Sequence, residues 1–283
     1  MKRWRVIFTG ASDAFFNMAL DEALLLSCQK GASPPVLRLY LWKPPAVSMG
    51  YFQSAEKVVD FRKCKDKGIH VVRRITGGRA VLHEDEITYS VCASADDFPH
   101  LGENTIHTYQ RLSLALLESL RLLGIDGEWV KPHTDKKVSP FHQIFSKPCF
   151  VSNSRYEILV GGKKLIGSAQ RRFSFRSDQG KKDSFIQHGS ILTGNGEHSL
   201  AELLPEEGLV ERVKQNLEEK STNIEKILQR RVRAEEIVFA LRLGFEKVFA
   251  CRMEDSVVSD EELKVAQIMK EKKYFSEGWN LGR

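Results

Sequence analysis

The sequence has few cysteines, and their spacing fits neither a disulfide framework nor a zinc site. Secreted disulfide scaffolds and zinc sites use paired, closely spaced cysteines. This chain of 283 residues has an odd number of scattered cysteines and no CxxC pair, so we expect neither. The question that remains is whether one of these thiols is a nucleophile. The five are Cys28, Cys64, Cys92, Cys149 and Cys251.

Long apolar runs are also missing. No run approaches the roughly 20 residues that a membrane-spanning helix needs. The start, MKRWRVIFTG, is basic, but its apolar run is too short for a signal peptide and no small-residue cleavage site follows. We therefore expect a cytoplasmic protein with no membrane partner. The sequence has no P-loop, no GxGxxG motif, no internal repeat and no low-complexity segment.

Positive charge is only mildly in excess. The formal net charge of +6 suits an acidic protein partner or a nucleic acid and distinguishes neither. The run QRRVRAEE near Arg230 could belong to a DNA-binding helix, but we interpret it as the charged face of an amphipathic helix. We therefore expect no nucleic-acid partner. The length allows a large core, in one domain with an extension or in two domains.

Strand and helix periodicities alternate along the first two thirds of the chain, which predicts a mixed α/β fold. Asp13 is placed to cap the first helix, and Ser259 with Glu262 makes a capping box for the last one. From about Ser199 the pattern turns helical. The predicted strands cover 4–8, 36–42, 47–50, 87–91, 156–160, 164–170 and 185–192, and the predicted helices cover 14–29, 54–67, 105–123, 203–219, 234–250 and 261–272.

The stretch VVRRITGGRAVLHEDEITYSVCA, residues 71–93, is the strongest candidate for a binding site. It consists of two short apolar runs, two turns and an alternating strand. The paired glycines Gly77 and Gly78 allow positive φ angles and a close approach of backbone to a ligand. Arginines flank this bare backbone, which suits an elongated substrate with an anionic or carbonyl-rich part. The alternative is an ordinary hairpin turn with solvated arginines.

Cys149 differs from the other cysteines, because it follows a proline at the end of an irregular segment, which favours partial exposure. A free thiol with a pKa of about 8.5 is only a few per cent ionised at pH 7. An ammonium group about 4 Å away offers up to roughly 4 kcal/mol at an effective dielectric constant of about 20, and each pKa unit needs about 1.4 kcal/mol. Lys163 and Lys164 follow on a predicted hairpin, where only one can face the site. From the residues alone, Cys149 is either a nucleophile activated in this way or a buried structural cysteine.

A metal site is a weaker interpretation of the histidines. His83 with Glu86, or with His188, does not have the spacing of a known ligand set. Histidines with satisfied hydrogen bonds are the commoner case, so we expect no bound metal.

Three motifs together resemble one family. RRITGGRAVLHEDEITYS, GGKKLIGSAQRR and HGSIL resemble the motifs of the lipoyl and octanoyl transfer enzymes of the biotin/lipoate protein ligase family. NMALDEALL near the start and KYFSEGWN near the end also fit, so the similarity covers nearly the whole chain. The sequence is most similar to the LipM-type octanoyltransferases. This resemblance implies an α+β catalytic domain, similar to those of biotin ligases and class II tRNA synthetases, at residues 1–205, with a helical C-terminal extension at residues 206–283 packed on it.

The resemblance also implies a reaction and a site. Octanoyl-acyl carrier protein would donate its acyl group to Cys149, and a lysine of a lipoyl domain or of the glycine cleavage H protein would accept it, without a cofactor. Lys164 falls on the family's lysine and would favour the thiolate and relay protons. We expect the substrate to contact the residues of the first two motifs, namely Arg73, Thr76, Gly77, Gly78, Arg79, His83, Gly167, Ser168 and Ala169.

Two related activities remain as alternatives. Lipoate ligases carry a further glycine where this chain has Arg79, and they use ATP and no cysteine. Arg79 together with Cys149 therefore favours transfer from a thioester. An octanoyl amidotransferase between lipoyl domains also uses a cysteine, but its first motif lacks the His83–Glu86 turn.

Overall fold

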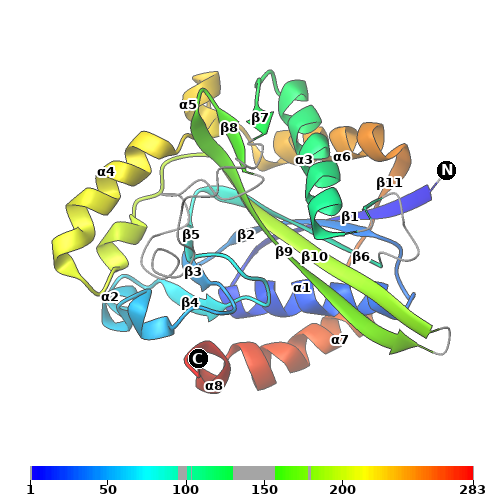
Figure 1. Cartoon of the computed structure of the whole chain (residues 1–283), viewed down its shortest axis with the longest axis horizontal. Helices are drawn as coiled ribbons and strands as arrows, with labels where there is room; N and C mark the ends of the chain where they lie inside the picture. Colours follow the sequence, from blue (N-terminus) through cyan, green and yellow to red (C-terminus); the bar gives the residue numbers. More distant parts are fainter. Residues whose placement is uncertain (1, 95–100, 103, 130–156, 178–179, 283) are drawn as a thin grey trace.

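The computed structural model describes residues 2–94, 101–102, 104–129, 157–177 and 180–282. In these residues a mixed sheet of eight strands runs in the order β11-β1-β2-β6-β10-β9-β8-β7, and a second sheet runs in the order β4-β3-β5 (Figure 1). Strand β1 is parallel to both β11 and β2, whereas the pairs from β2 to β9 are antiparallel. The predicted α+β class is therefore confirmed.

The strands of the described residues are β1 Lys2–Ser12, β2 Val36–Trp42, β3 Ala46–Met49, β4 His70–Arg73, β5 Val81–His83, β6 Glu86–Ser94, β7 Glu128–Trp129, β8 Ile158–Val160, β9 Lys163–Ser177, β10 Gly180–Leu192 and β11 Cys251–Asp255. The helices are α1 Ala14–Gln29, α2 Phe61–Asp66, α3 Thr105–Leu122, α4 Val210–Lys220, α5 Ile224–Leu228, α6 Ala234–Phe249, α7 Asp260–Met269 and α8 Glu277–Asn280.

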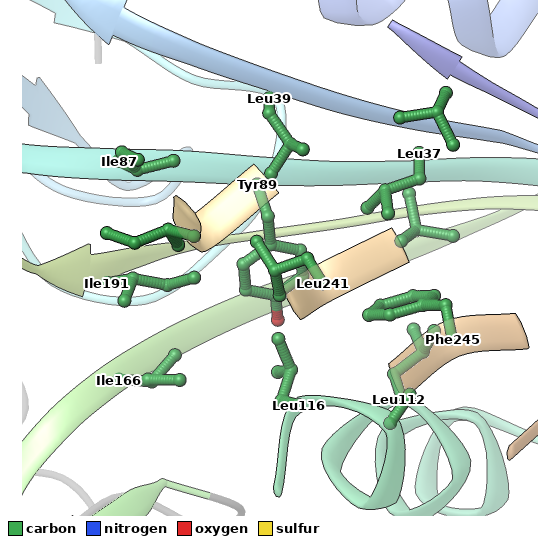
Figure 2. Packing of buried hydrophobic residues seen from close by; sticks show 14 of the residues in the cluster. Leu37, Leu39, Ile87, Tyr89, Leu112, Leu116, Ile166, Ile191, Leu241 and Phe245 are labelled. Atoms are coloured by element: carbon green, nitrogen blue, oxygen red, sulfur yellow. The ribbon is translucent and has the colours of Figure 1, made fainter. Parts of the chain in front are cut away.

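One face of the main sheet is covered by α3 and α6. Figure 2 shows strand residues such as Tyr89 and Ile166 facing Leu116 of α3 and Leu241 of α6. All of them belong to one buried apolar cluster, so burial of this face supplies much of the hydrophobic stabilisation of the fold.

Helix α1 covers the opposite face of the sheet and is itself covered by α7 (Figure 1). Asp13 caps α1 by accepting from the N–H of Phe16, and the Ser259–Glu262 capping box opens α7, as predicted. Cys28, near the end of α1, belongs to the buried apolar cluster between this helix and the sheet.

The structure differs from the sequence-based expectation in several places, and the helix expected at 203–219 begins only at Val210. The C-terminal segment is not wholly helical, because β11 joins the edge of the main sheet beside β1. Residues 171–177 and 180–182 of the basic stretch, for which no strand was predicted, extend β9 and β10 into a long hairpin (Figure 1). The helix expected at 54–67 is interrupted, with a 3₁₀ turn at Ala55–Lys57 before α2. Among the described residues, no helix is both long enough and apolar enough to cross a membrane.

Candidate active site

The second and third motifs lie side by side because β9 and β10 pair along their length. His188 pairs with Ala169, and Gly189 pairs with Ser168. Gly189 has no space for a side chain, because a Cβ there would lie 2.4 Å from the carbonyl oxygen of Gly167. The close contact of these strands therefore requires glycine at this position.

The first motif closes onto this pair through its glycine turn, which connects β4 to β5. Gly78 has a φ of +91°, and a Cβ built there would lie 3.8 Å from the Cβ of Ala169. On its other side the turn packs on Gly50, where a Cβ would lie 1.9 Å from the carbonyl oxygen of Gly78. The space beside Gly77 is open, with no atom within 4 Å of a Cβ position. All three motifs thus meet at one place.

Thr76 is fully buried at the start of the turn. It is the last member of a chain of hydrogen-bonded polar side chains. Its Oγ1 lies 2.6 Å from Nε2 of His188, and Nδ1 of His188 lies 3.2 Å from Oδ2 of Asp21. Asp21 also accepts from Arg38 at 2.8 Å and from the hydroxyl of Tyr40 at 2.9 Å. The order hydroxyl, imidazole, carboxylate is also that of a catalytic triad.

The protonation states of this line follow from its surroundings. Burial acts to raise the pKa of Asp21, but Arg38 and His188 hold it below its ordinary value. Burial lowers the pKa of His188, although Asp21 opposes the shift. A neutral His188 therefore has its proton on Nδ1, facing the Asp21 carboxylate, and accepts from the hydroxyl of Thr76 at Nε2. Asp21 was not among the predicted site residues, although an aspartate within the apolar NMALDEALL motif is a signal of a buried polar contact.

His83 lies on β5 with both ring nitrogens engaged. Its Nε2 lies 2.7 Å from Oγ of Ser48, its Nδ1 lies 2.8 Å from Oε1 of Glu86, and its ring stacks on Trp42 with centroids 4.0 Å apart. These contacts fix the imidazole and match the expectation of a histidine with satisfied hydrogen bonds. Among the described residues, no group of three or more metal-ligating side chains could hold a metal ion.

Arg73 and Arg74 do not extend into solvent, as a pair of solvated arginines would. Arg73 is fully buried and donates to the carbonyl oxygens of Gly50, Gln53 and Asn280 at 2.7–3.0 Å. These partners make Arg73 a clamp between the 50–53 loop and the C-terminal helix. Arg73, one of the sequence-predicted site residues, therefore supports the site through the backbone segments that it binds.

The three predicted substrate-binding residues on β9, Gly167, Ser168 and Ala169, do not all lie on the same face of the strand. Ala169 faces the glycine turn, whereas the hydroxyl of Ser168 lies 2.7 Å from the hydroxyl of Tyr89 in the core under α3. Gln187 also donates to this tyrosine, and burial raises the pKa of Tyr89 to about 12. Strand alternation therefore gives Ser168 a packing role and leaves Gly167 and Ala169 beside the turn.

Lys164 is buried beside a carboxylate that the sequence analysis did not identify. Its Nζ donates to Oε1 of Glu157 at 2.5 Å, and neither side chain is more than 2% exposed. Lys163 is exposed, so only one of the two lysines points inward, as expected. Glu157 had no distinguishing signal, because it stands outside the motifs.

A register shift decides which way Lys164 points. Ile158 of β8 pairs with Ile166 of β9, but the next residue of β8, Leu159, pairs with Lys164. Strand β9 therefore has one extra residue at this point. Because of this bulge, Leu165 and Ile166 both join the core under α3 and α6. We infer that Lys164 lies on the opposite face of β9, the face that also carries Gly167 and Ala169.

The predicted nucleophile, Cys149, lies outside the described residues. The other four thiols are all buried. Burial raises the pKa of Cys28 to about 12, raises those of Cys64 and Cys251 to about 11, and places that of Cys92 well above its ordinary value. Thiols of this kind have almost no thiolate at pH 7, so none of the four suits nucleophilic attack.

A cleft of about 600 Å³ borders the strand that carries Lys164. One wall includes Thr222, whose N–H donates to the carbonyl oxygen of Lys164 at 2.9 Å. Leu82 lines the cleft, whereas Val72 and Tyr89 are fully buried in core clusters. Polar and apolar groups contribute about equally to the lining of the cleft. Its acidic residues are Glu84, Glu197, Glu202 and Glu218.

Solved structures of lipoate-protein ligases have the same fold. A lipoate-protein ligase A bound with ATP aligns with a TM-score of 0.76 at 26% identity, covering 100% of this chain and 99% of that one. A bi-partite lipoate protein ligase from Thermoplasma acidophilum aligns with a TM-score of 0.79 at 24% identity and shares the fold.

Sequence comparison is more specific. The family model of the lipoyl protein ligase A/B catalytic domain matches residues 13–246. The octanoyltransferase LipM of Anoxybacillus flavithermus is 38% identical over 282 residues, which cover 99% of this chain and 98% of that protein. The octanoyltransferase LipM of Bacillus subtilis is 37% identical with the same coverage. The chain therefore belongs to the lipoyl protein ligase A/B catalytic-domain family, within the group of LipM octanoyltransferases.

Proposed function

We propose that this protein transfers an octanoyl group from octanoyl-acyl carrier protein, through a thioester on Cys149, to a lysine of a lipoyl domain or of the glycine cleavage H protein. The observation that carries the covalent route is the burial of the other thiols. A cysteine-dependent octanoyl transfer needs one thiol that can ionise. The raised pKa values make the other four cysteines unsuitable, which leaves Cys149 as the candidate nucleophile.

In the first step the Cys149 thiolate attacks the carbonyl carbon of the octanoyl thioester. A new C–S bond forms, the carbonyl oxygen takes the electron pair, and collapse of this oxyanion expels the thiolate of the carrier. Lys164 stands on the inward face of β9 and supports the negative charge of both thiolates. Glu157 keeps the Lys164 ammonium fixed inside the fold.

In the second step a neutral lysine amine attacks the same carbonyl carbon. The C–S bond to Cys149 breaks, an amide forms, and the amine releases one proton, which the departing Cys149 thiolate or solvent takes up. This is ping-pong covalent catalysis. The oxyanion of both steps needs hydrogen-bond donors, and the backbone N–H groups of Gly77 and Gly78 are the best placed candidates beside the open space of the turn.

Intact-mass measurement tests the proposal. Incubation with octanoyl-acyl carrier protein should add one octanoyl group to the wild type, and a later addition of apo lipoyl domain should move that group to the domain. Cys149→Ser should acquire no thioester, and Cys251→Ser is the matched control that should still be acylated. Absence of acylation in the wild type would refute the covalent route.

The main alternative is an ATP-dependent lipoate-protein ligase, because the structural relative with 26% identity is a ligase bound with ATP. Arg79 in place of a further glycine argues against it. Incubation with lipoate, ATP and apo lipoyl domain separates the two, since only a ligase modifies the domain without an acyl carrier. An amidotransferase would instead accept octanoyl-H protein as its donor, which the same mass measurement detects.

We further infer a division of roles along the chain. The side chains assigned to chemistry all come from residues 1–205, whereas residues 206–283 supply supporting contacts such as those of Asn280 to Arg73. The C-terminal segment therefore braces the catalytic part.

A further inference from the structure

Arg74 binds the backbone of the glycine turn through hydrogen bonds. Its side chain is 4% exposed and donates to three backbone carbonyl oxygens. Nη2 lies 2.8 Å from the oxygen of Gly77 and 2.7 Å from that of Arg79, while Nη1 lies 2.8 Å from the oxygen of Ser48. In the sequence this arginine resembles its neighbours Arg73 and Arg79, and its hydrogen-bond partners are what distinguish it.

The direction of two peptide groups follows from these contacts. In a planar trans peptide the carbonyl and the following N–H point in opposite directions. Arg74 holds the carbonyl of Gly77, and the N–H of Tyr51 holds the carbonyl of Thr76 at 2.9 Å. The N–H groups of Gly77 and Gly78 therefore both point away from these partners. Within the described part of the chain, neither N–H donates to a backbone carbonyl oxygen.

The glycine at position 78 is what lets the guanidinium reach the turn. A Cβ there would lie 2.8 Å from Nη2 of Arg74, and the φ of +91° disfavours any other residue. The buried positive charge also polarises the peptide groups that it binds, which strengthens their N–H groups as donors. A lysine could replace the charge of Arg74, but it has no planar fork to hold two carbonyls at once.

We propose that Arg74 is a positioning residue for octanoyl transfer, which holds the 76–79 turn so that the N–H groups of Gly77 and Gly78 donate to the thioester carbonyl oxygen. The inference rests on the proposed function, because it concerns the carbonyl of the octanoyl-enzyme. In this arrangement Arg74 acts on the acyl carbonyl through the backbone carbonyl oxygens of the turn that it binds.

The test is the carbonyl stretching frequency of the octanoyl-enzyme, formed with octanoyl groups labelled with ¹³C at the carbonyl. Hydrogen bonds to the carbonyl oxygen lower this frequency, so the wild type should absorb below a free octanoyl thioester. Arg74→Lys should move the frequency toward the free value and lower kcat about 10²–10³-fold with little change in KM. Gly78→Ala, which pushes the guanidinium away, should move it in the same direction.

Arg5→Lys is the matched control. Arg5 is also largely buried, and it forms an ion pair with Glu262 at 2.6 Å and donates to the carbonyl of Val257 at 2.7 Å, away from the glycine turn. Its replacement should lower the melting temperature and leave the carbonyl frequency and kcat unchanged. A role of Arg74 in stability alone predicts this same behaviour for Arg74→Lys.

Two outcomes overturn the inference while leaving octanoyl transfer intact. One is a wild-type octanoyl-enzyme whose carbonyl absorbs at the frequency of a free thioester, a result that needs no variant to fold. The other is a folded Arg74→Lys variant with wild-type frequency and kcat. If no octanoyl-enzyme forms in the wild type at all, the proposed function fails as well, so the two failures are distinguishable.

Discussion

At the residue scale, the buried pair of Lys164 and Glu157 should contribute to the stability of the fold and to the chemistry of acyl transfer, and the two contributions can be measured separately. Removal of one partner from a buried ion pair leaves an uncompensated charge and costs about 3–5 kcal/mol, whereas an apolar replacement of both can be close to neutral. We expect Lys164→Met to lower the free energy of unfolding by that amount, and Lys164→Met/Glu157→Leu to recover most of it. Urea denaturation measures both effects.

The same two variants separate stability from chemistry. If Lys164 supports the Cys149 thiolate, acylation by octanoyl-acyl carrier protein should be lost in the single and in the double variant alike. A double variant that is stable and still acylated at the wild-type rate would limit Lys164 to a structural role.

His188 should make the stability of the protein depend on pH. Burial, together with the charges of Arg74 and His83, lowers its pKa below the ordinary value of 6.5, while Asp21 opposes this shift. The unfolded chain therefore binds a proton that the folded chain does not, and stability falls as the pH drops below 6.5 toward the lowered pKa. The loss is at most about 1.4 kcal/mol per pH unit.

His188→Gln should remove this contribution. In urea denaturation between pH 7 and pH 5, the variant should lose less stability on acidification than the wild type. The control is His107→Gln at an exposed position on α3, which should keep the wild-type slope. An unchanged slope in His188→Gln would mean that other groups cause the pH dependence.

At the scale of elements, close backbone contacts make the glycine turn dependent on its neighbours. A Cβ at Gly50 would lie 1.9 Å from the carbonyl oxygen of Gly78, so Gly50→Ala must displace the turn. We expect a loss of about 1–3 kcal/mol, as for other overpacked sites, and a loss of octanoyl transfer. Gly208→Ala, which has open space around it, should change neither. Thermal unfolding and the mass assay check both variants.

The elements that the sequence predicted correctly are those with a local signal. The apolar stripe of α1 and the alternation of β6 are visible in a short window, because period 3.6 and period 2 follow from the geometry of one element. Strand β11 has only five residues and depends on pairing with β1, which lies about 250 positions earlier. The basic hairpin strands had no apolar alternation to identify them.

The site was predictable to the same extent. The glycine turn and Lys164 belong to motifs, so the sequence indicated both of them. Glu157 could not be found in this way, because it stands outside the motifs and is identified by Lys164, which folding brings to it across the β8–β9 turn. Asp21 belongs to the NMALDEALL motif, but its role becomes visible when folding brings Arg38 of β2 to it. The face of β9 on which the Ser168 side chain lies depends on how the strand pairs with its neighbours. The face on which the Lys164 side chain lies depends on the bulge between β8 and β9.

At the scale of the whole molecule, the C-terminus is connected to the glycine turn through Arg73. The backbone N–H of Arg73 donates to Oδ1 of Asn280 at 2.7 Å, and Nε1 of Trp279 donates to the carbonyl of Arg73 at 2.8 Å. Arg73 also holds the 50–53 loop, whose Tyr51 in turn holds the carbonyl of Thr76. The last helix thus acts on a turn that lies some 200 residues earlier in the sequence.

Deletion of residues 276–283 should therefore damage the turn as well as the terminus. Arg73 would lose its partners on α8, the 50–53 loop would loosen, and the N–H groups of Gly77 and Gly78 would lose their fixed direction. We expect a lower melting temperature and a kcat for octanoyl transfer that falls more steeply than the extent of folding. Deletion of residues 281–283 alone keeps Trp279 and Asn280 and should leave both values unchanged. If the longer deletion lowers the melting temperature but folded protein retains wild-type kcat, the connection through Arg73 stabilises the fold without shaping the site.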